Sequence, residues 1–215
     1  MKADEHERFA AIPVPTSEGG FNRLCQLPHG LTVEHVHAAM NEFLEFLQFI
    51  NEQMVGRDLP RLEAMLMQAN FSSLVGEFMK TAIPKAHSGL AANRYHNGHP
   101  DLVPTRHYPG NSVQHGNTGV EIKGSRYLTG WQGHNPENTF LMVFSFDCNR
   151  PADDGEGIPP RPFRFLQVAA GPLLESDWNY SGRSETSRRT ITATVNRAAS
   201  QRMIANHVYR DPGII

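Results

Sequence analysis

Hydrophobic residues in the first third of the chain recur at steps of three and four, which is the spacing of one helix face. The clearest case follows Thr32, a suitable N-cap, and runs to Met54. Its stripe consists of Val33, Val36, Met40, Phe43, Leu44, Leu47, Ile50 and Met54. The same spacing predicts two further helices, one opened by Pro60 and one over 72–83 that Pro84 ends.

Beyond Ser88 the pattern changes to short apolar or alternating runs separated by Gly, Pro and Asn, which is typical of β-strands. The six runs are LAANRY, DLVP, GVEIKGSR, TFLMVFSF, FRFLQVAA and TITATV. TFLMVFSF, at 139–146, is apolar almost throughout, so we expect a central strand with helices on both faces. The pattern also predicts an exposed loop at 149–162 and a last helix over 196–209.

This order of elements predicts an α/β or α+β fold, in which one mixed central β-sheet is flanked by helices. With 215 residues, of which 39% are hydrophobic, the chain can build one compact domain. We expect a mainly helical part at 1–85, a catalytic sheet core at 86–170 and a basic part at 171–215. No signal peptide or membrane span is predicted, so the expected location is cytoplasmic.

Basic residues are concentrated near the end of the chain, although the net charge is only -2. The segment 181–202 holds five arginines and one acidic residue, Glu185. Arginines among Ser and Thr hydroxyls are typical phosphate contacts, so we expect nucleic acid to bind there. The candidate contacts, including one arginine just after the GVEIKGS strand, are Arg126, Arg183, Arg188, Arg189 and Arg197. The two cysteines are too far apart to suggest a disulfide framework or a zinc site.

Two opposite charges share one face of a predicted strand. Because side chains alternate along a strand, Glu121 and Lys123 point to the same face in GVEIKGSR. A hairpin or near-hairpin through TRHYPGNSVQHGNT, at 105–118, would place Asp101 beside Glu121. Two carboxylates held so close repel one another, which favours a raised pKa or a bound cation. Oxygen ligands, including the main-chain carbonyl of Ile122, select Mg²⁺, with Mn²⁺ as a substitute.

Pro100-Asp101 followed by Glu121-Ile122-Lys123 resembles the PD-(D/E)xK nuclease superfamily, the restriction-endonuclease-like fold, over roughly 72–170. The resemblance implies a Mg²⁺-dependent DNA endonuclease, most naturally a type II restriction endonuclease, with Asp101 and Glu121 as metal ligands. Lys123 would assist the attacking water, and Glu77 matches an acidic residue on the preceding helix. Double-stranded DNA and a homodimer joined through the N-terminal helices are implied as well. One departure is the segment 127–138, because two glycines and a proline interrupt any crossover helix there.

Other interpretations fit the same residues. Glu121 and Lys123 could form a structural ion pair, and Glu77 could pair with Lys80 or Thr81 one turn later. The chain could be a nucleic-acid-binding or mobile-element accessory protein without catalysis, or a repair or recombination nuclease for branched or single-stranded DNA. Five histidines near the proposed site match no zinc pattern. They are His96, His99, His107, His115 and His134.

Overall fold

The computed structural model describes residues 3–133, 135–181 and 192–214, and it has a mixed α+β architecture. Helices dominate the first 86 residues, and strands dominate the rest, as the sequence predicts. The helices are α1 (Ala3–Ala10), α2 (Val33–Val55), α3 (Leu62–Met65), α4 (Gln68–Ala86) and α5 (Arg197–Ala205). The short 3-10 helices are η1 (Glu18–Gly20), η2 (Pro109–Asn111) and η3 (Glu175–Asp177).

The central sheet has four strands in the order β3-β5-β6-β9. Strand β3 runs parallel to β5, and the other two pairs are antiparallel, so the sheet is mixed as predicted. A two-stranded sheet, β1-β2, and a three-stranded sheet, β4-β8-β7, accompany it. The strands are β1 (Leu90–Ala92), β2 (Leu102–Pro104), β3 (Glu121–Ser125), β4 (Gln132–Gly133), β5 (Thr139–Asp147), β6 (Arg164–Leu173), β7 (Trp178–Ser181), β8 (Thr192–Val195) and β9 (His207–Arg210).

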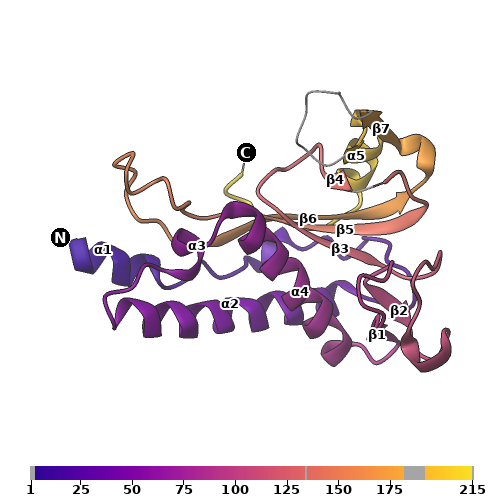
Figure 1. The fold of residues 1–215 in the computed structure, drawn as a ribbon, viewed down its shortest axis with the longest axis horizontal. Coiled ribbons are helices and arrows are strands. Elements are labelled where there is room, and N and C mark those ends of the chain that lie inside the picture. Colours follow the sequence, from indigo (N-terminus) through magenta and orange to yellow (C-terminus); the bar gives the residue numbers. More distant parts are fainter. Residues whose placement is uncertain (1–2, 134, 182–191, 215) are drawn as a thin grey trace.

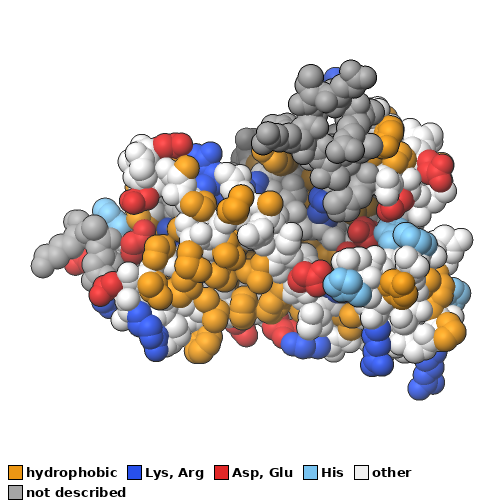
Figure 2. All heavy atoms as spheres, viewed as in Figure 1, with side chains coloured by type: hydrophobic (Ala, Val, Ile, Leu, Met, Phe, Trp, Pro, Cys, Tyr) orange, Lys and Arg blue, Asp and Glu red, His pale blue; other side chains and the backbone are white. Residues whose placement is uncertain are grey.

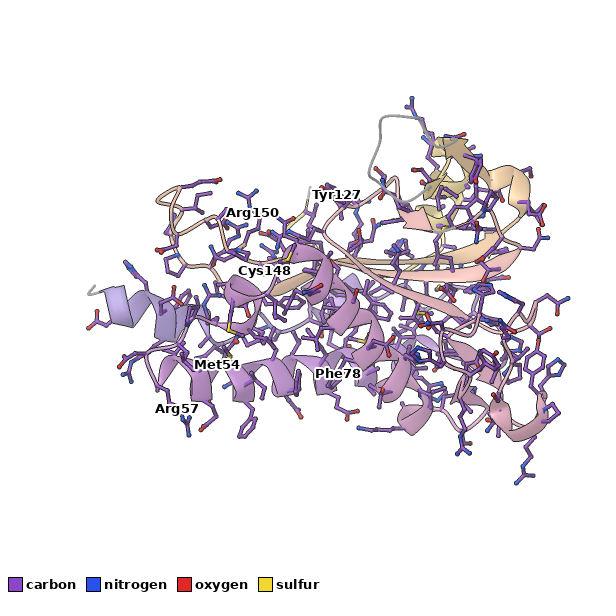
Figure 3. All side chains as sticks on the ribbon, viewed as in Figure 1. Met54, Arg57, Phe78, Tyr127, Cys148 and Arg150 are labelled. Atoms are coloured by element: carbon purple, nitrogen blue, oxygen red, sulfur yellow. The ribbon has the colours of Figure 1, made fainter. Side chains whose placement is uncertain are left out.

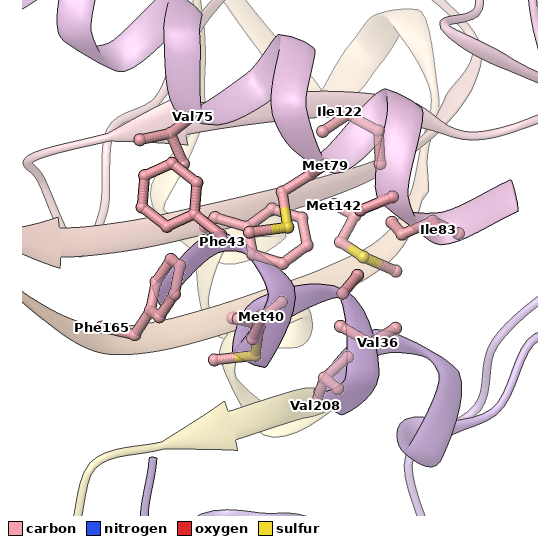
Figure 4. Close-up of a cluster of buried hydrophobic side chains, with 14 of the residues drawn as sticks. Val36, Met40, Phe43, Val75, Met79, Ile83, Ile122, Met142, Phe165 and Val208 are labelled. Carbon is pink, nitrogen blue, oxygen red and sulfur yellow. The ribbon is translucent and has the colours of Figure 1, made fainter. Parts of the chain in front are cut away.

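Helices cover both faces of the central sheet (Figure 1). The main hydrophobic core joins α2 and α4 to one face, and Figure 4 shows Met40 of α2 and Met79 of α4 in the same buried cluster as Met142 of β5. A smaller core joins α5 to the opposite face around Trp131. The central apolar strand expected at 139–146 is therefore confirmed in β5, whose residues 141–146 are all buried.

Several predicted boundaries are wrong, each for a local reason. The helix expected after Pro60 is a single turn, because Arg61 and Glu63 are buried side chains that tie this segment to other elements. Pro84 does not end the third helix, since α4 continues to Ala86. A proline in the last turn removes only one hydrogen bond, and the His87 N–H still donates to the Ile83 carbonyl (2.9 Å).

The last helix is shorter than expected because residues 207–210 form β9 instead. The Asn206 side chain ends α5 by donating to the carbonyls of Gln26 and Ala170 (2.9 and 3.0 Å). The chain then pairs with β6, where Val208 and Tyr209 are buried. A β-branched and an aromatic residue suit this half-buried strand, and their burial outweighs the helical spacing.

The loop 149–162 is only partly exposed, contrary to expectation. Its tip is open to solvent, but Asn149 and Asp153 are buried and hydrogen-bonded. Figure 3 shows Cys148 and Arg150 at the base of this loop, where β5 ends. Among the described residues, no helix combines the length and apolar character that a membrane crossing requires.

Candidate active site

Strand β3 places its two charged side chains on the face away from α2 and α4. Ile122 enters the main core, so Glu121 and Lys123 point to the opposite face, as the alternation predicts. The strand lies at the outer end of the central sheet. Gly124 allows α4 to approach closely, because a Cβ there would collide with the Ser72 carbonyl.

Asp101 lies directly beside Glu121, which confirms the predicted near-hairpin. A pair of hydrogen bonds between the main chains of Leu102 and Val120 (2.9 and 2.8 Å) fixes the register. As a result, the Ile122 N–H donates to Asp101 Oδ2 (3.0 Å), and the Asp101 N–H donates to Glu121 Oε2 (3.2 Å). The carboxylate of each acidic residue is therefore held by the backbone of the other's strand.

The electrostatics of this pair are unfavourable without a further partner. Burial and the nearby Glu121 carboxylate raise the pKa of Asp101 to about 7. Burial also lowers the pKa of Lys123, although the charges of Glu121 and Asp101 oppose this shift. Both shifts arise chiefly from removal of a charged group from water, which is the pattern found at many catalytic sites.

Glu77 lies on α4 at the border of the site. Its carboxylate contacts Lys80 Nζ at 3.3 Å, and the same Nζ lies 3.7 Å from Asp101 Oδ1. The local ion pair that was the alternative interpretation of Glu77 is therefore present. Lys80 joins that pair to the site, and a direct ligand role of Glu77 stays a prediction.

His99 and Glu137 are site residues that the sequence did not single out for a role. His99 Nδ1 lies 3.0 Å from Glu121 Oε2 and 3.3 Å from Glu137 Oε2. Burial alone would lower the pKa of His99, but the Glu121, Glu137 and Asp101 carboxylates raise it. His99 lies two residues before Asp101, and this spacing could have indicated that His99 contacts Glu121 as Asp101 does. For Glu137 there was no such indication, since its position depends on the path of the chain from β3 to β5.

The described residues of that path form no helix, in agreement with the two glycines and the proline that interrupt 127–138. It carries the short strand β4 and buried Trp131, whose indole N–H donates to the Tyr127 carbonyl (2.9 Å). Trp131 anchors the smaller core on the Lys123 side of the sheet. The cover that a crossover helix would supply comes from Trp131 and α5.

A groove crosses the site and leaves the charged residues accessible. Two adjoining cavities of about 790 and 840 Å³ share Glu77, Asp101 and Lys123 in their walls. The first extends past Ser72 of α4 to Tyr127, which is 72% exposed and labelled in Figure 3. The second extends toward residues 93–99 and Glu137. An extended polar substrate could therefore pass across Lys123 in either direction.

The donor set fits a hard divalent cation. Asp101 and Glu121 supply carboxylate oxygens, and Ile122, whose carbonyl oxygen is the third candidate donor, lines the same groove. The Ile122 carbonyl oxygen faces Gly76 of α4, because a Cβ added at Gly76 would lie 3.8 Å from this oxygen. No group of three His, Cys, Asp or Glu within the described ranges is placed to hold a metal ion. Mg²⁺ is usually held by only one or two carboxylates, together with water and substrate phosphate.

The five arginines predicted to contact phosphate lie in different surroundings or outside the described residues. The Arg126 guanidinium donates to the Cys148 carbonyl (2.6 Å) and sulfur (3.0 Å), so most of its hydrogen bonds are made within the protein. Arg197 is exposed at the start of α5. Arg183, Arg188 and Arg189 lie outside the described residues, as does His134. The binding role of all these arginines stays a prediction.

Comparison of this chain with protein-family models, with curated proteins and with solved structures finds no match.

Proposed function

We propose that this protein is a Mg²⁺-dependent endonuclease that hydrolyses phosphodiester bonds in double-stranded DNA, most naturally a type II restriction endonuclease. The observation that carries the proposal is the convergence of Asp101, Glu121 and Lys123 at a groove, with two carboxylates held 3.2 Å or less from the partner strand's backbone N–H groups. The strand arrangement supports the restriction-endonuclease-like fold, since Asp101 precedes β2 and the E-x-K strand β3 runs parallel to β5.

Each residue has a role that follows from its position. Asp101, Glu121 and the Ile122 carbonyl would hold Mg²⁺ or Mn²⁺, which when bound neutralises phosphate charge and acidifies water. Lys123, on the same strand face as Glu121, positions the attacking water or stabilises charge that develops on the phosphate. Lys80 keeps positive charge beside Asp101 and is a further candidate to contact a phosphate.

The first test is cleavage of plasmid and phage DNA in Mg²⁺, in Mn²⁺ and in EDTA. We expect discrete metal-dependent fragments from the natural protein. Lys123→Ala and Glu121→Gln should each lower the cleavage rate by roughly 10³-fold or more while leaving folding and DNA binding intact. Lys85→Ala is the control, because Lys85 is an exposed lysine of α4 that pairs with Glu42 outside the groove.

The outcomes separate the alternatives. Unchanged cleavage by either site variant would refute the assignment of these residues. Metal-independent binding with no cut on any substrate would favour a non-catalytic nucleic-acid-binding or mobile-element accessory protein. Branched and single-stranded oligonucleotides belong in the same assay, since preferential cleavage of these would indicate a repair or recombination nuclease instead.

A further inference from the structure

The groove has one exposed tyrosine in each of its two cavities. Tyr127, which is 72% exposed, lines the first cavity, and Tyr95, which is 42% exposed, lines the second. Figure 2 shows that exposed hydrophobic side chains spread over α2 and α4, whereas acidic and histidine side chains gather toward β1 and β2. A single exposed aromatic ring is ordinary on a protein surface. Whether these two rings have a function depends on how firmly the fold holds them.

The backbone of Tyr127 is held by buried groups of the core. Its carbonyl accepts from the indole N–H of Trp131 and from the hydroxyl of Ser145, both at 2.9 Å. These two donor residues are 1% and 0% exposed. The Tyr127 N–H in turn donates to the Ser125 hydroxyl oxygen (3.0 Å). Two buried side chains from different segments therefore fix the position of a residue whose own side chain is exposed.

Tyr95 is held in a comparable way by the buried side-chain amide of Asn93. The Oδ1 atom of Asn93 accepts from the N–H groups of Tyr95 and Val113, both at 3.1 Å. Its Nδ2 atom donates to the carbonyls of Pro100 and Val113 (2.9 and 2.8 Å), so the amide is fully used. Gly98 packs on the same turn, since a Cβ there would lie 2.9 Å from Tyr95 Cβ. The exposed residues 94–97 are thus presented by a firmly held turn.

The two tyrosines lie toward opposite ends of the groove. Tyr127 follows the C-terminal end of β3 by two residues. Tyr95 belongs to the turn ahead of Asp101, whose N–H donates to Glu121 at the other end of β3. Strand β3 alone spans about 16 Å at about 3.3 Å per residue, roughly the length of four to five stacked nucleotides. A DNA strand that passes Lys123 can therefore meet one tyrosine on each side.

We propose that Tyr95 and Tyr127 stack on unpaired bases, so that the groove holds a DNA strand whose bases near Lys123 are separated from the complementary strand. A tyrosine ring can stack on a base only where a face of that base is free, and inside a duplex both faces are covered by neighbouring bases. The inference rests on the proposed function for the choice of DNA as the ligand, and it adds the state of the bound strand.

Fluorescence anisotropy of labelled oligonucleotides tests this without cleavage, with Ca²⁺ in place of Mg²⁺ and again with EDTA. Tyr95→Ala and Tyr127→Ala should each weaken binding of a single strand of about 20 nucleotides by roughly tenfold. Tyr95→Phe and Tyr127→Phe keep the ring and should change the affinity by less than about twofold. Tyr180→Ala is the matched control, because Tyr180 of β7 is 53% exposed and, within the described part of the chain, lines neither cavity.

A second measurement separates base stacking from a purely structural role of the rings. Abasic sites in the middle of the oligonucleotide should weaken binding to the natural protein by roughly tenfold, and the alanine substitutions should then weaken it little further. A duplex with a central run of mismatches should bind more tightly than a fully paired one, because its bases are already free. Tyrosine dependence with the fully paired duplex would indicate that the protein opens it, and dependence only with unpaired DNA would indicate that it does not.

Three results would overturn the inference. They are equal binding by the natural protein and both alanine variants, a loss with phenylalanine as large as with alanine, and no binding to any of these oligonucleotides. Mg²⁺-dependent cleavage that neither alanine substitution changes would overturn the inference alone, whereas tyrosine-dependent binding without cleavage would overturn the proposed function alone. Circular dichroism checks the fold of each variant. If an alanine variant loses its fold, the effect of the abasic sites on the natural protein decides.

Discussion

Asp101 of the candidate active site and Asp153 of the loop after β5 are both largely removed from solvent, with side chains 20% and 2% exposed. Burial would raise the pKa of either carboxyl. For Asp153, hydrogen bonds from Arg150 and Asn149 reverse this and hold the pKa below its usual value. For Asp101, the Glu121 carboxylate adds to the effect of burial, and the pKa rises to about 7. The more deeply buried carboxylate is thus the better stabilised one.

The surroundings of Asp153 belong to a buried ionic cluster centred on Arg61. This guanidinium, 1% exposed, donates to Glu63 (2.6 Å), to Asn149 (2.7 Å) and to Glu7 of α1 (2.8 Å). Asn51 of α2 donates to the other oxygen of Glu63 (2.9 Å). Every charge has a partner supplied by the chain, so this cluster holds elements together. The candidate active site instead leaves repelling carboxylates beside a groove, and that difference supports the proposal that a ligand binds there.

The largest effect should come from breaking the Arg61 cluster. Arg61→Met leaves Glu63 buried without its cation, so we expect the free energy of unfolding to fall by about 3–5 kcal/mol. Urea unfolding followed by circular dichroism measures it. Arg61→Met combined with Glu63→Leu should recover much of the loss, because the charge left without its partner, Glu7, is partly exposed rather than buried. A double variant as unstable as the single one would show that the hydrogen bonds to Asn149 and Glu7 carry the stability instead.

A matched pair of substitutions tests the comparison most directly. At pH 8, Asp153→Asn should destabilise the fold, whereas Asp101→Asn should stabilise it, the latter by on the order of 2 kcal/mol. Asparagine at position 101 keeps an oxygen to accept from the Ile122 N–H, yet it removes the repulsion from Glu121. Chemical unfolding of both variants gives the two signs. If both substitutions changed the free energy of unfolding in the same direction, the two aspartates would not differ as described.

The pH dependence of this difference has a definite direction. The folded chain holds the Asp101 proton up to a pKa of about 7, against an ordinary pKa of 3.8. The natural protein therefore loses stability as the pH rises from about 4 to about 7, whereas the Asp101→Asn variant does not lose this contribution. The stability advantage of Asp101→Asn should vanish near pH 4. For Asp153 the pKa is lowered, so its stabilisation is lost only as the pH falls below about 4.

Much of the candidate site was predictable because it depends on local geometry. The alternation of β3 places Glu121 and Lys123 on one face. The near-hairpin between Asp101 and Glu121 brings their two carboxylates together. The apolar run of β5 likewise predicts a strand covered on both faces. These features need only the period of a strand and the position of one near-hairpin.

What could not be predicted depends on contacts distant in sequence. Nothing in the local sequence distinguishes Arg61, beside Pro60, from a surface residue. Only the packing of α1, α3 and the loop after β5 shows that it is buried. The change from α5 to β9 depends on pairing with β6, which overrides the helical spacing of 196–209. Glu137 reaches the site through the connection from β3 to β5, and no local pattern in the sequence predicts the path of that connection.

The smallest of these effects should come from His99, which contacts both Glu121 and Glu137 and so orients the carboxylate proposed to hold the metal ion. His99→Asn should raise the Mg²⁺ concentration for half-maximal cleavage by about tenfold, with a smaller change in the maximal rate. Glu137→Gln leaves the His99–Glu121 contact in place and should change it less than threefold. His107→Asn is the control, because His107 packs on Tyr108 outside this contact. A loss of maximal rate with no change in Mg²⁺ dependence would instead place His99 in direct contact with the DNA.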